Sequence, residues 1–245
     1  MLKNALRVVS LVPSWTETLV FAGINVVGRT RFCIHPQDLV KSILQVGGTK
    51  DLDINKIKAL QPDYVIVDQE ENTLEMAENL RNAGLSLIVT HVTDFESIIK
   101  FCNDLSLQLE SPKLKEIAER YTQVLSKIDP QLMISKCLLK GEFDPAEAKK
   151  SCEYVIWKKP FMVIGSNTFI AANLKLADLE IRHVEKYPTI DDSEIKKSYC
   201  LFSSEPYPFL KKYDQLMTEG YRGVVVDGEK LSWFGIRNLN FLESC

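Results

Sequence analysis

Short apolar runs alternate with amphipathic stretches along the N-terminal part of the chain. Val8–Val12, Tyr64–Val67 and Leu85–Thr90 are largely apolar and rich in β-branched residues, which is typical of buried strands. Two stretches that follow them, Thr73–Ala83 and Asp94–Leu105, repeat apolar residues at helical spacing. Strands that alternate with helices predict βαβ units and a parallel sheet.

A longer helix interrupts this alternation. Pro112–Ile128 repeats apolar residues with the period of an amphipathic helix, and Ser111 is a natural N-cap before it. Strands are predicted again at Tyr154–Trp157 and Tyr199–Phe202. The pattern predicts an α/β fold with two α/β lobes, each with a parallel sheet, joined by one long rigid helix, with a ligand cleft between the lobes. The predicted ranges are 1–105 for the N-terminal lobe, 106–135 for the connecting helix and 136–245 for the C-terminal lobe.

Capping and turn residues complete this prediction. Asp53 is a plausible N-cap for a short helix, and the polar stretch Gly141–Lys150 is expected to be a surface excursion. The remaining expected strands are Val26-Val27 and Val224–Val226, and the remaining helices are Thr16–Ala22, Ile54–Leu60, Thr168–Leu176, Asp191–Lys197 and Pro208–Glu219.

The composition is ordinary for a globular protein and excludes some partners. The chain has 245 residues, of which 45% are hydrophobic and 26% are charged, and its formal net charge is -3. Because no sustained basic stripe is present, nucleic acid is not an expected partner. No stretch approaches the ~20 apolar residues of a membrane-spanning helix, so we expect no membrane insertion.

The first residues and the cysteines bear on location. Lys3 and Arg7 precede the apolar run Val8–Val12, but that run is too short for the core of a signal peptide. As given, the sequence predicts a cytoplasmic protein, and a periplasmic or surface-tethered one if a leader has been removed. The six cysteines show no C-x-x-C spacing, which favours free thiols in a reducing compartment over zinc or disulfides.

Candidate binding residues of the first lobe follow predicted strands, where open α/β sheets collect ligands. Ser14 and Thr16 lie at a strand-to-helix turn and are candidates to hydrogen-bond a ligand, with helix capping as the alternative for Ser14. Trp15 is expected to line the cleft rather than the core. Phe32 and His35 are expected at the same rim.

Histidines and acids of this lobe leave two interpretations open. His35 is a candidate ligand for a corrin cobalt or a chelated ion, but a histidine bonded to backbone is preferred. His91 and His183 are the only other histidines, and no pair has metal-ligand spacing, so no metal site is predicted. Glu70 either accepts hydrogen bonds from ligand amides or is an ordinary first-turn acid.

The second lobe offers aromatic rings and cations. Trp157 and Lys159 follow a predicted strand, where Lys159 supplies a cation for an anionic ligand group and Trp157 supplies apolar area or packs in the core. Glu205, Tyr207 and Phe209 stand among two prolines that hold the rings in place, which suits a planar ligand. The alternative is a hydrophobic turn that packs against Trp233 and Phe234.

The C-terminal residues are expected to form a loop over the cleft. Trp233, Phe234 and Arg237 follow Asp227-Gly228, which is a turn signal. Arg237 is expected to pair with a ligand carboxylate or phosphate, or with Glu205.

Motifs in a fixed order resemble the helical-backbone (class III) solute-binding proteins of ABC transporters, in their cobalamin-binding and iron-chelate-binding branch. In the first half they are Arg7–Glu17, Phe32–Pro36, Val46–Thr49 and Leu60–Ile66. In the second half they are Ile156–Met162, Ser204–Phe209, Val226–Gly228 and Ser232–Gly235. The resemblance covers nearly the whole chain and implies two lobes, one long connecting helix, a ligand between the lobes and an ABC permease as partner.

One departure from the family pattern concerns the permease. The resemblance implies a glutamate on each lobe that docks onto permease arginines, and those positions are Asn55 and Ser193 here. Asp53, Asp192 and Glu194 lie close by and are candidates to replace them. A cytoplasmic relative that keeps the cleft without transport is the alternative.

The resemblance implies a small-molecule binding protein and not an enzyme. Its expected ligand is cobalamin or another corrinoid, or a ferric chelate, with no tightly bound cofactor and no catalytic residue. The alternative is an enzyme on the same scaffold that uses Cys33, His35 and Glu205, since Cys33 and His35 share a face of an extended segment. No P-loop, G-x-G-x-x-G or G-x-S-x-G motif supports that alternative.

Overall fold

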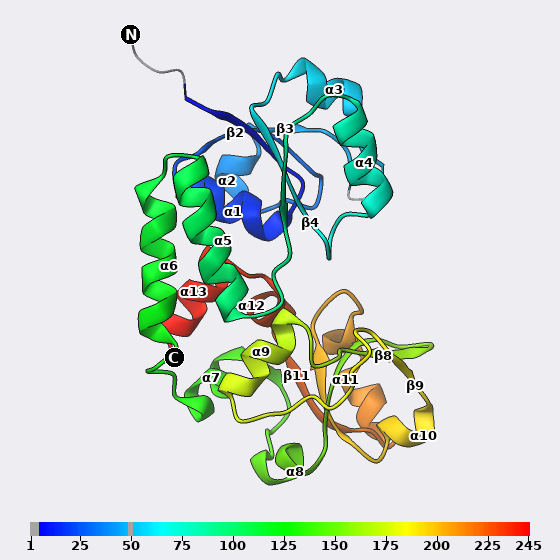
Figure 1. Cartoon of the computed structure of the whole chain (residues 1–245). Coiled ribbons are helices and arrows are strands. Elements are labelled where there is room, and N and C mark those ends of the chain that lie inside the picture. Colours follow the sequence, from blue (N-terminus) through cyan, green and yellow to red (C-terminus); the bar gives the residue numbers. More distant parts are fainter. Residues whose placement is uncertain (1–4, 49–50) are drawn as a thin grey trace. The chain divides into compact units, whose positions relative to one another are not determined.

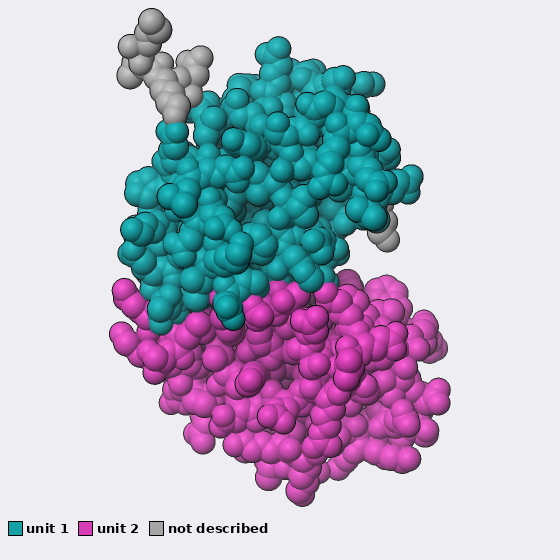
Figure 2. Space-filling model, viewed as in Figure 1, with its two compact units in different colours: residues 1–92, 96–122, 234–239 teal, residues 93–95, 123–233, 240–245 magenta. Residues whose placement is uncertain are grey.

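The computed structural model describes residues 5–48 and 51–245, which form two compact units (Figures 1 and 2). Unit 1 comprises residues 1–92, 96–122 and 234–239, and unit 2 comprises residues 93–95, 123–233 and 240–245. Lys3 and Thr49, which belong to sequence patterns above, lie outside the described residues. The role of residues 106–135 as the connection between lobes stays a prediction.

Unit 1 is built on a five-stranded sheet in the order β3-β2-β1-β4-β5, with parallel pairing throughout. Its strands are β1 (Arg7–Ser10), β2 (Asn25–Arg29), β3 (Leu44–Gln45), β4 (Tyr64–Asp68) and β5 (Leu87–Thr90). The strand order reverses between β1 and β4. The carboxyl ends of these two strands therefore form the switch point at which open α/β sheets bind ligands.

The helices of unit 1 begin and end where capping chemistry places them. They are α1 (Pro13–Phe21), α2 (Gln37–Val40), α3 (Ile54–Ala59), α4 (Leu74–Asn82) and most of α5 (Phe95–Gln108), α6 (Pro112–Val124) and α13 (Ile236–Glu243). Asp53 caps α3, as predicted, because its carboxylate accepts from the Lys56 backbone N–H. α1 begins at Pro13 rather than Thr16, since the fixed φ of proline suits the first helical turn. α6 ends at Val124, one turn before the predicted Ile128.

The core of unit 1 packs α3 and α4 against the sheet (Figure 1). Val9 and Val65 of the strands meet Ile57 of α3 and Leu80 of α4, and all four are fully buried. Burial of a large aliphatic side chain stabilises the fold by roughly 1.5–3 kcal/mol. This packing holds the carboxyl ends of β1 and β4 in place.

Unit 2 contains a six-stranded sheet in the order β6-β11-β10-β7-β8-β9. The strands are β6 (Leu138–Lys140), β7 (Cys152–Trp157), β8 (Phe161–Val163), β9 (Thr189–Ile190), β10 (Tyr199–Ser203) and β11 (Arg222–Val226). The central strands β11, β10 and β7 are parallel, whereas β6, β8 and β9 pair antiparallel. The prediction of a parallel sheet thus holds for the centre of unit 2 but not for its edges, where the short β7–β8 turn can only join antiparallel strands.

The helices of unit 2 are α7 (Pro130–Cys137), α8 (Pro145–Lys150), α9 (Phe169–Leu176), α10 (Asp192–Ile195), α11 (Phe209–Thr218) and α12 (Gly228–Ser232). The sequence pattern predicted α9, α10 and α11 but missed α7, α8 and α12. α8 lies in the stretch expected to be a surface excursion. α12 replaces the expected loop after Asp227, because the Asp227 carboxylate caps a helix by accepting from the Lys230 backbone N–H.

Candidate functional site

A buried hydrogen-bond network lies at the carboxyl ends of β4 and β5. Asp68 is fully buried, and its carboxylate accepts from Thr90 Oγ1 (2.7 Å), Glu70 N (2.9 Å) and Val92 N (3.3 Å). Burial raises the pKa of Asp68 above its ordinary value. Thr90 Oγ1 in turn accepts from the indole N–H of Trp15 at 2.9 Å. The network joins α1 to the two strands and fixes the geometry of this sheet edge.

Carboxylates gather just beyond β4. Glu70 Oε1 lies 3.0 Å from His91 Nε2. Desolvation by the surrounding protein, with the charges of Asp68 and Glu70, raises the pKa of Glu71 to about 7. Near neutral pH this edge therefore presents a carboxyl group that can donate as well as accept a hydrogen bond.

The residues predicted at the first strand-to-helix turn are structural. Trp15 is fully buried, with its ring centroid 5.3 Å from that of Phe234, so it packs in the core and does not line an open surface as expected. Ser14 is buried inside α1, and Val12 occupies the N-cap position, so Ser14 does not cap the helix. Thr16 Oγ1 is buried 2.9 Å from Val12 O and 3.0 Å from Cys33 Sγ.

The segment after β2 is partly open. Phe32 is 47% exposed, and the Arg31 guanidinium lies 5.1 Å from its ring centroid. His35 is half-buried and precedes a cis proline. Within residues 5–48 and 51–245, no group of three or more histidine, cysteine or acidic side chains is arranged to hold a metal ion.

The geometry of Cys33 does not favour the enzyme alternative. Its thiol is fully buried and lies 3.0 Å from Thr16 Oγ1 and 3.2 Å from Thr30 Oγ1. Burial raises the pKa of Cys33 above its ordinary value. A catalytic cysteine needs the opposite shift, because the thiolate is the nucleophile.

Two of the C-terminal candidates also belong to the framework of unit 1. Phe234 is buried against Trp15 and is not part of an exposed loop. Arg237 pairs with Glu17: its Nε donates to Oε2 at 2.8 Å and its Nη2 to Oε1 at 3.0 Å. Both side chains are mostly buried, so this bidentate pair fixes α13 to α1.

Unit 2 presents an exposed indole at the carboxyl end of β7. Trp157 is 41% exposed, and its ring meets that of Tyr207 edge to face with centroids 5.5 Å apart. Tyr207 is half-buried and lies 4.5 Å from the ring of Phe209. Phe209 itself is fully buried in the core of unit 2, so it supports the aromatic pair and offers no ligand surface.

Glu205 and Trp233 meet at the ends of β10 and α12. The indole N–H of Trp233 donates to Glu205 Oε1 at 3.3 Å, and both residues are half-buried. A Cβ on Gly228 would come within 2.9 Å of Glu205 Cγ, so only glycine allows this close approach. The structure thus brings Trp157 together with Tyr207, and Glu205 together with Trp233, within unit 2.

Three residues that shape these edges were missed by sequence reasoning: Asp68, Thr90 and Lys212. Asp68 ends the apolar run Tyr64–Val67, and a lone carboxyl at the end of a buried strand is a usable signal. Lys212 Nζ lies 5.8 Å from the ring centroid of Tyr207, and nothing in its helical pattern distinguishes it from Lys211.

The two positions at which the resemblance implies docking glutamates carry no charge here, and two of the nearby acids are already paired. Asn55 and Ser193 are exposed. Asp53 caps α3 and lies 3.6 Å from the ammonium of Lys56. Asp192 pairs with Lys196 at 2.8 Å and accepts from the Tyr221 hydroxyl.

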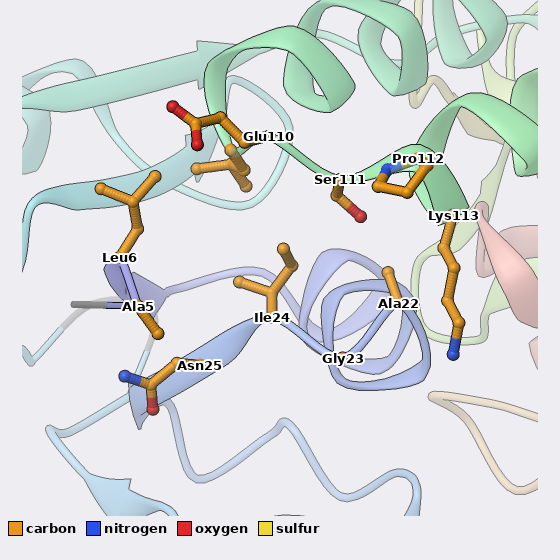
Figure 3. Close-up of a pocket in the computed structure, with 11 residues that line it drawn as sticks. Ala5, Leu6, Ala22, Gly23, Ile24, Asn25, Glu110, Ser111, Pro112 and Lys113 are labelled. Carbon is orange, nitrogen blue, oxygen red and sulfur yellow. The ribbon is translucent and has the colours of Figure 1, made fainter. Parts of the chain in front are cut away.

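Cavities of unit 1 lie apart from the predicted residues. One, of about 400 Å³, is at the amino edge of the sheet, between the α1–β2 turn and the α5–α6 connection (Figure 3). Leu6 and Ile24 point into it, with Glu110 and Lys113 at its rim. A second, of about 410 Å³, runs along α4 from Asp68 to Arg81.

The folds of the two units match those of solved binding proteins. A doubly wound α/β unit and a second α/β unit, over almost the whole chain, form the fold of the class III binding proteins of ABC transporters. The chain matches the periplasmic vitamin B12-binding protein BtuF of Vibrio cholerae with a TM-score of 0.72 and 17% identity, over 97% of this chain and 93% of that one. It matches the periplasmic heme-binding protein BhuT, solved with two hemes, with a TM-score of 0.74 and 18% identity, over 96% of this chain and 94% of that one.

Sequence comparison points to the same group. The vitamin B12-binding protein of Salmonella paratyphi A is 28% identical over 119 residues, which are 49% of this chain. The matched part spans 43% of the length of that relative, and no protein-family model matches the chain. These relatives are named as binding proteins rather than as enzymes. Across the described part of the chain, no helix is long and apolar enough to cross a membrane.

Proposed function

We propose that this chain is the ligand-binding component of an ABC transporter and that it binds a corrinoid, a heme or an iron chelate. The observation that carries the proposal is the match of both units, over nearly their whole length, to solved vitamin B12-binding and heme-binding proteins. The exposed indole of Trp157 at the carboxyl edge of unit 2 supports it, because a flat ring ligand needs aromatic surface.

The two sheet edges offer complementary chemistry for such a ligand. The unit 1 edge provides Glu70, Glu71 and His91, which can form hydrogen bonds with amide groups of a ligand. The unit 2 edge provides Trp157 and Glu205. In this proposal Phe32 and His35 stand at the rim of unit 1 and contribute to binding there.

Location and partner follow from the same comparison. The two structural relatives are described as periplasmic, which favours the periplasmic or surface-tethered alternative over a cytoplasmic carrier. Docking to a permease would have to use charges other than Asn55 and Ser193. Glu194, which is exposed on α10 next to Ser193, is a candidate acid in unit 2.

A titration of tryptophan fluorescence tests the proposal. Cobalamin, cobinamide, heme and a ferric siderophore are added separately, and we expect saturable quenching at about micromolar concentration or lower by at least one of them. Trp157→Ala should weaken that binding by about 10-fold, whereas Leu139→Ala, which truncates an equally exposed apolar side chain of unit 2, should leave it unchanged. The absence of a saturable response to all four compounds would contradict the proposal.

A further inference from the structure

The lysines around Trp157 bear on the chemical class of the ligand, an inference that rests on the proposed function. We infer that the ligand is a ring system with acidic groups, carboxylate or phosphate, at its edge, and that Lys159 and Lys212 bind these groups.

Adjacent lysines in the β7–β8 turn have different environments. Lys158 is 9% exposed at its side chain, its ammonium pairs with Glu219, and it lies 4.9 Å from the ring centroid of Tyr221. The ion pair with Glu219 therefore neutralises the charge of Lys158 within unit 2. Lys159 is exposed, and among the residues that the structure describes no carboxylate lies within salt-bridge distance of its ammonium.

The backbone at Lys159 is held in an unusual conformation. Its φ is 73°, in the left-handed region that a residue with a Cβ rarely adopts. The surrounding turn imposes this conformation, so the position of Lys159 next to the exposed Trp157 is set by the fold. Such local strain is common where a side chain must be aimed for binding.

A second cation lies near the ring of Tyr207. Lys212, in the first turn and a half of α11, places its Nζ 5.8 Å from the ring centroid of Tyr207, whose ring in turn meets Trp157. No carboxylate in the described ranges pairs with Lys212. The nearest acid along the chain, Asp214, pairs instead with Lys140 at 2.8 Å. The exposed indole is thus accompanied by two lysines that no salt bridge neutralises.

This arrangement favours an anionic ligand over a neutral one. Hydrogen bonds between an ammonium and a carboxylate or phosphate are about twice as strong as neutral ones, so an amide or ester in the same place gains much less. A porphyrin with free propionates and a corrinoid with its phosphodiester both satisfy the requirement. The same rings without these groups do not.

Paired ligands test this inference in the full chain. Heme is compared with its dimethyl ester, and cobalamin with cobinamide, by fluorescence titration at low and high salt. We expect the acidic member of the bound pair to bind about 10-fold more tightly, and this advantage to shrink with salt. Lys159→Gln and Lys212→Gln should each remove most of that advantage and leave the neutral member within about twofold. Lys211→Gln, which removes the same charge one residue away, should change neither.

Each outcome separates the two proposals. Equal binding of both members of each pair, or equal effects of Lys211→Gln and Lys212→Gln, would overturn the role of the lysines and leave the proposed function standing. If neither these four compounds nor a ferric siderophore binds, the proposed function fails and this inference fails with it. If only the siderophore binds, this inference is overturned and the proposed function stands.

Discussion

The indole N–H of Trp15 donates to Thr90 Oγ1 at 2.9 Å, across 75 residues of sequence, and both side chains are fully buried. Thr90 Oγ1 also lies 2.7 Å from Asp68 Oδ2. The hydroxyl of Thr90 therefore joins α1, β4 and β5 close to the sheet edge that carries Glu70 and Glu71. Through this hydrogen bond Trp15 stabilises the edge.

Trp15→Phe tests this supporting role. The substitution keeps a ring against Phe234 but removes the donor and leaves a small void, so we expect a loss of about 2 kcal/mol in the free energy of unfolding. Urea denaturation measures it. Because Trp15 does not face the ligand in our proposal, the affinity of the folded variant should stay within about threefold of the original. A large loss of affinity with unchanged stability would instead make Trp15 a binding residue.

Replacing the hydroxyl at position 90 tests the network from its centre. Thr90→Val keeps the shape but leaves the Asp68 carboxylate and the Trp15 N–H without their shared partner, which should cost about 1–3 kcal/mol of unfolding free energy. Thr90→Ser keeps the hydroxyl and should lose less. If Val and Ser destabilise equally, packing of the methyl group and not the hydrogen bonds determines the effect.

The sequence predicts the strands and main helices of both units because their apolar periodicity is local. Val8–Val12, Tyr64–Val67 and Tyr199–Phe202 coincide with β1, β4 and β10 within two residues. The short edge strands β3, β8 and β9 carry too few residues for a periodic signal, and their pairing depends on the neighbouring strand.

The candidate site was harder to predict, because proximity to a strand end does not tell which way a side chain points. Trp15 and Phe234 turn inward and pack on each other, whereas Trp157 stays exposed. Arg237 pairs with Glu17, 220 residues away in the sequence, and no local pattern reveals this contact. Capping at Asp53, by contrast, involves only neighbouring residues and was predicted correctly.

The Arg237–Glu17 pair should matter for stability and not for binding. Arg237→Ala leaves the mostly buried Glu17 carboxylate without its bidentate partner, so we expect a loss of about 2 kcal/mol in unfolding free energy. Arg237→Lys keeps the charge but not the planar fork and should lose roughly half as much. Thermal and urea unfolding measure both variants. A loss of ligand affinity in Arg237→Lys without loss of stability would restore Arg237 as a ligand-binding residue.

The raised pKa of Glu71 should make the free energy of unfolding fall as pH rises. The folded chain raises its pKa from 4.5 to about 7, so between these pH values the folded state holds a proton that the unfolded chain has lost. The free energy of unfolding therefore decreases with pH across this window, and the full penalty is present above pH 7. Glu71→Gln removes this dependence. Although protein atoms surround the Glu71 carboxyl, the residue is exposed by its surface area. Solvent therefore screens its charge, and the difference should be below about 1 kcal/mol.

Urea unfolding of the original chain and Glu71→Gln at pH 5 and pH 8 measures that difference directly. The raised pKa of the buried Asp68 adds a slope of the same sign, but it is common to both proteins and cancels in the comparison. We expect the variant to be the more stable of the two at pH 8 and the advantage to shrink toward pH 5. An advantage that is the same at both pH values would mean that Glu71 titrates alike in the folded and unfolded chain, and that the edge of unit 1 is fully ionised at neutral pH.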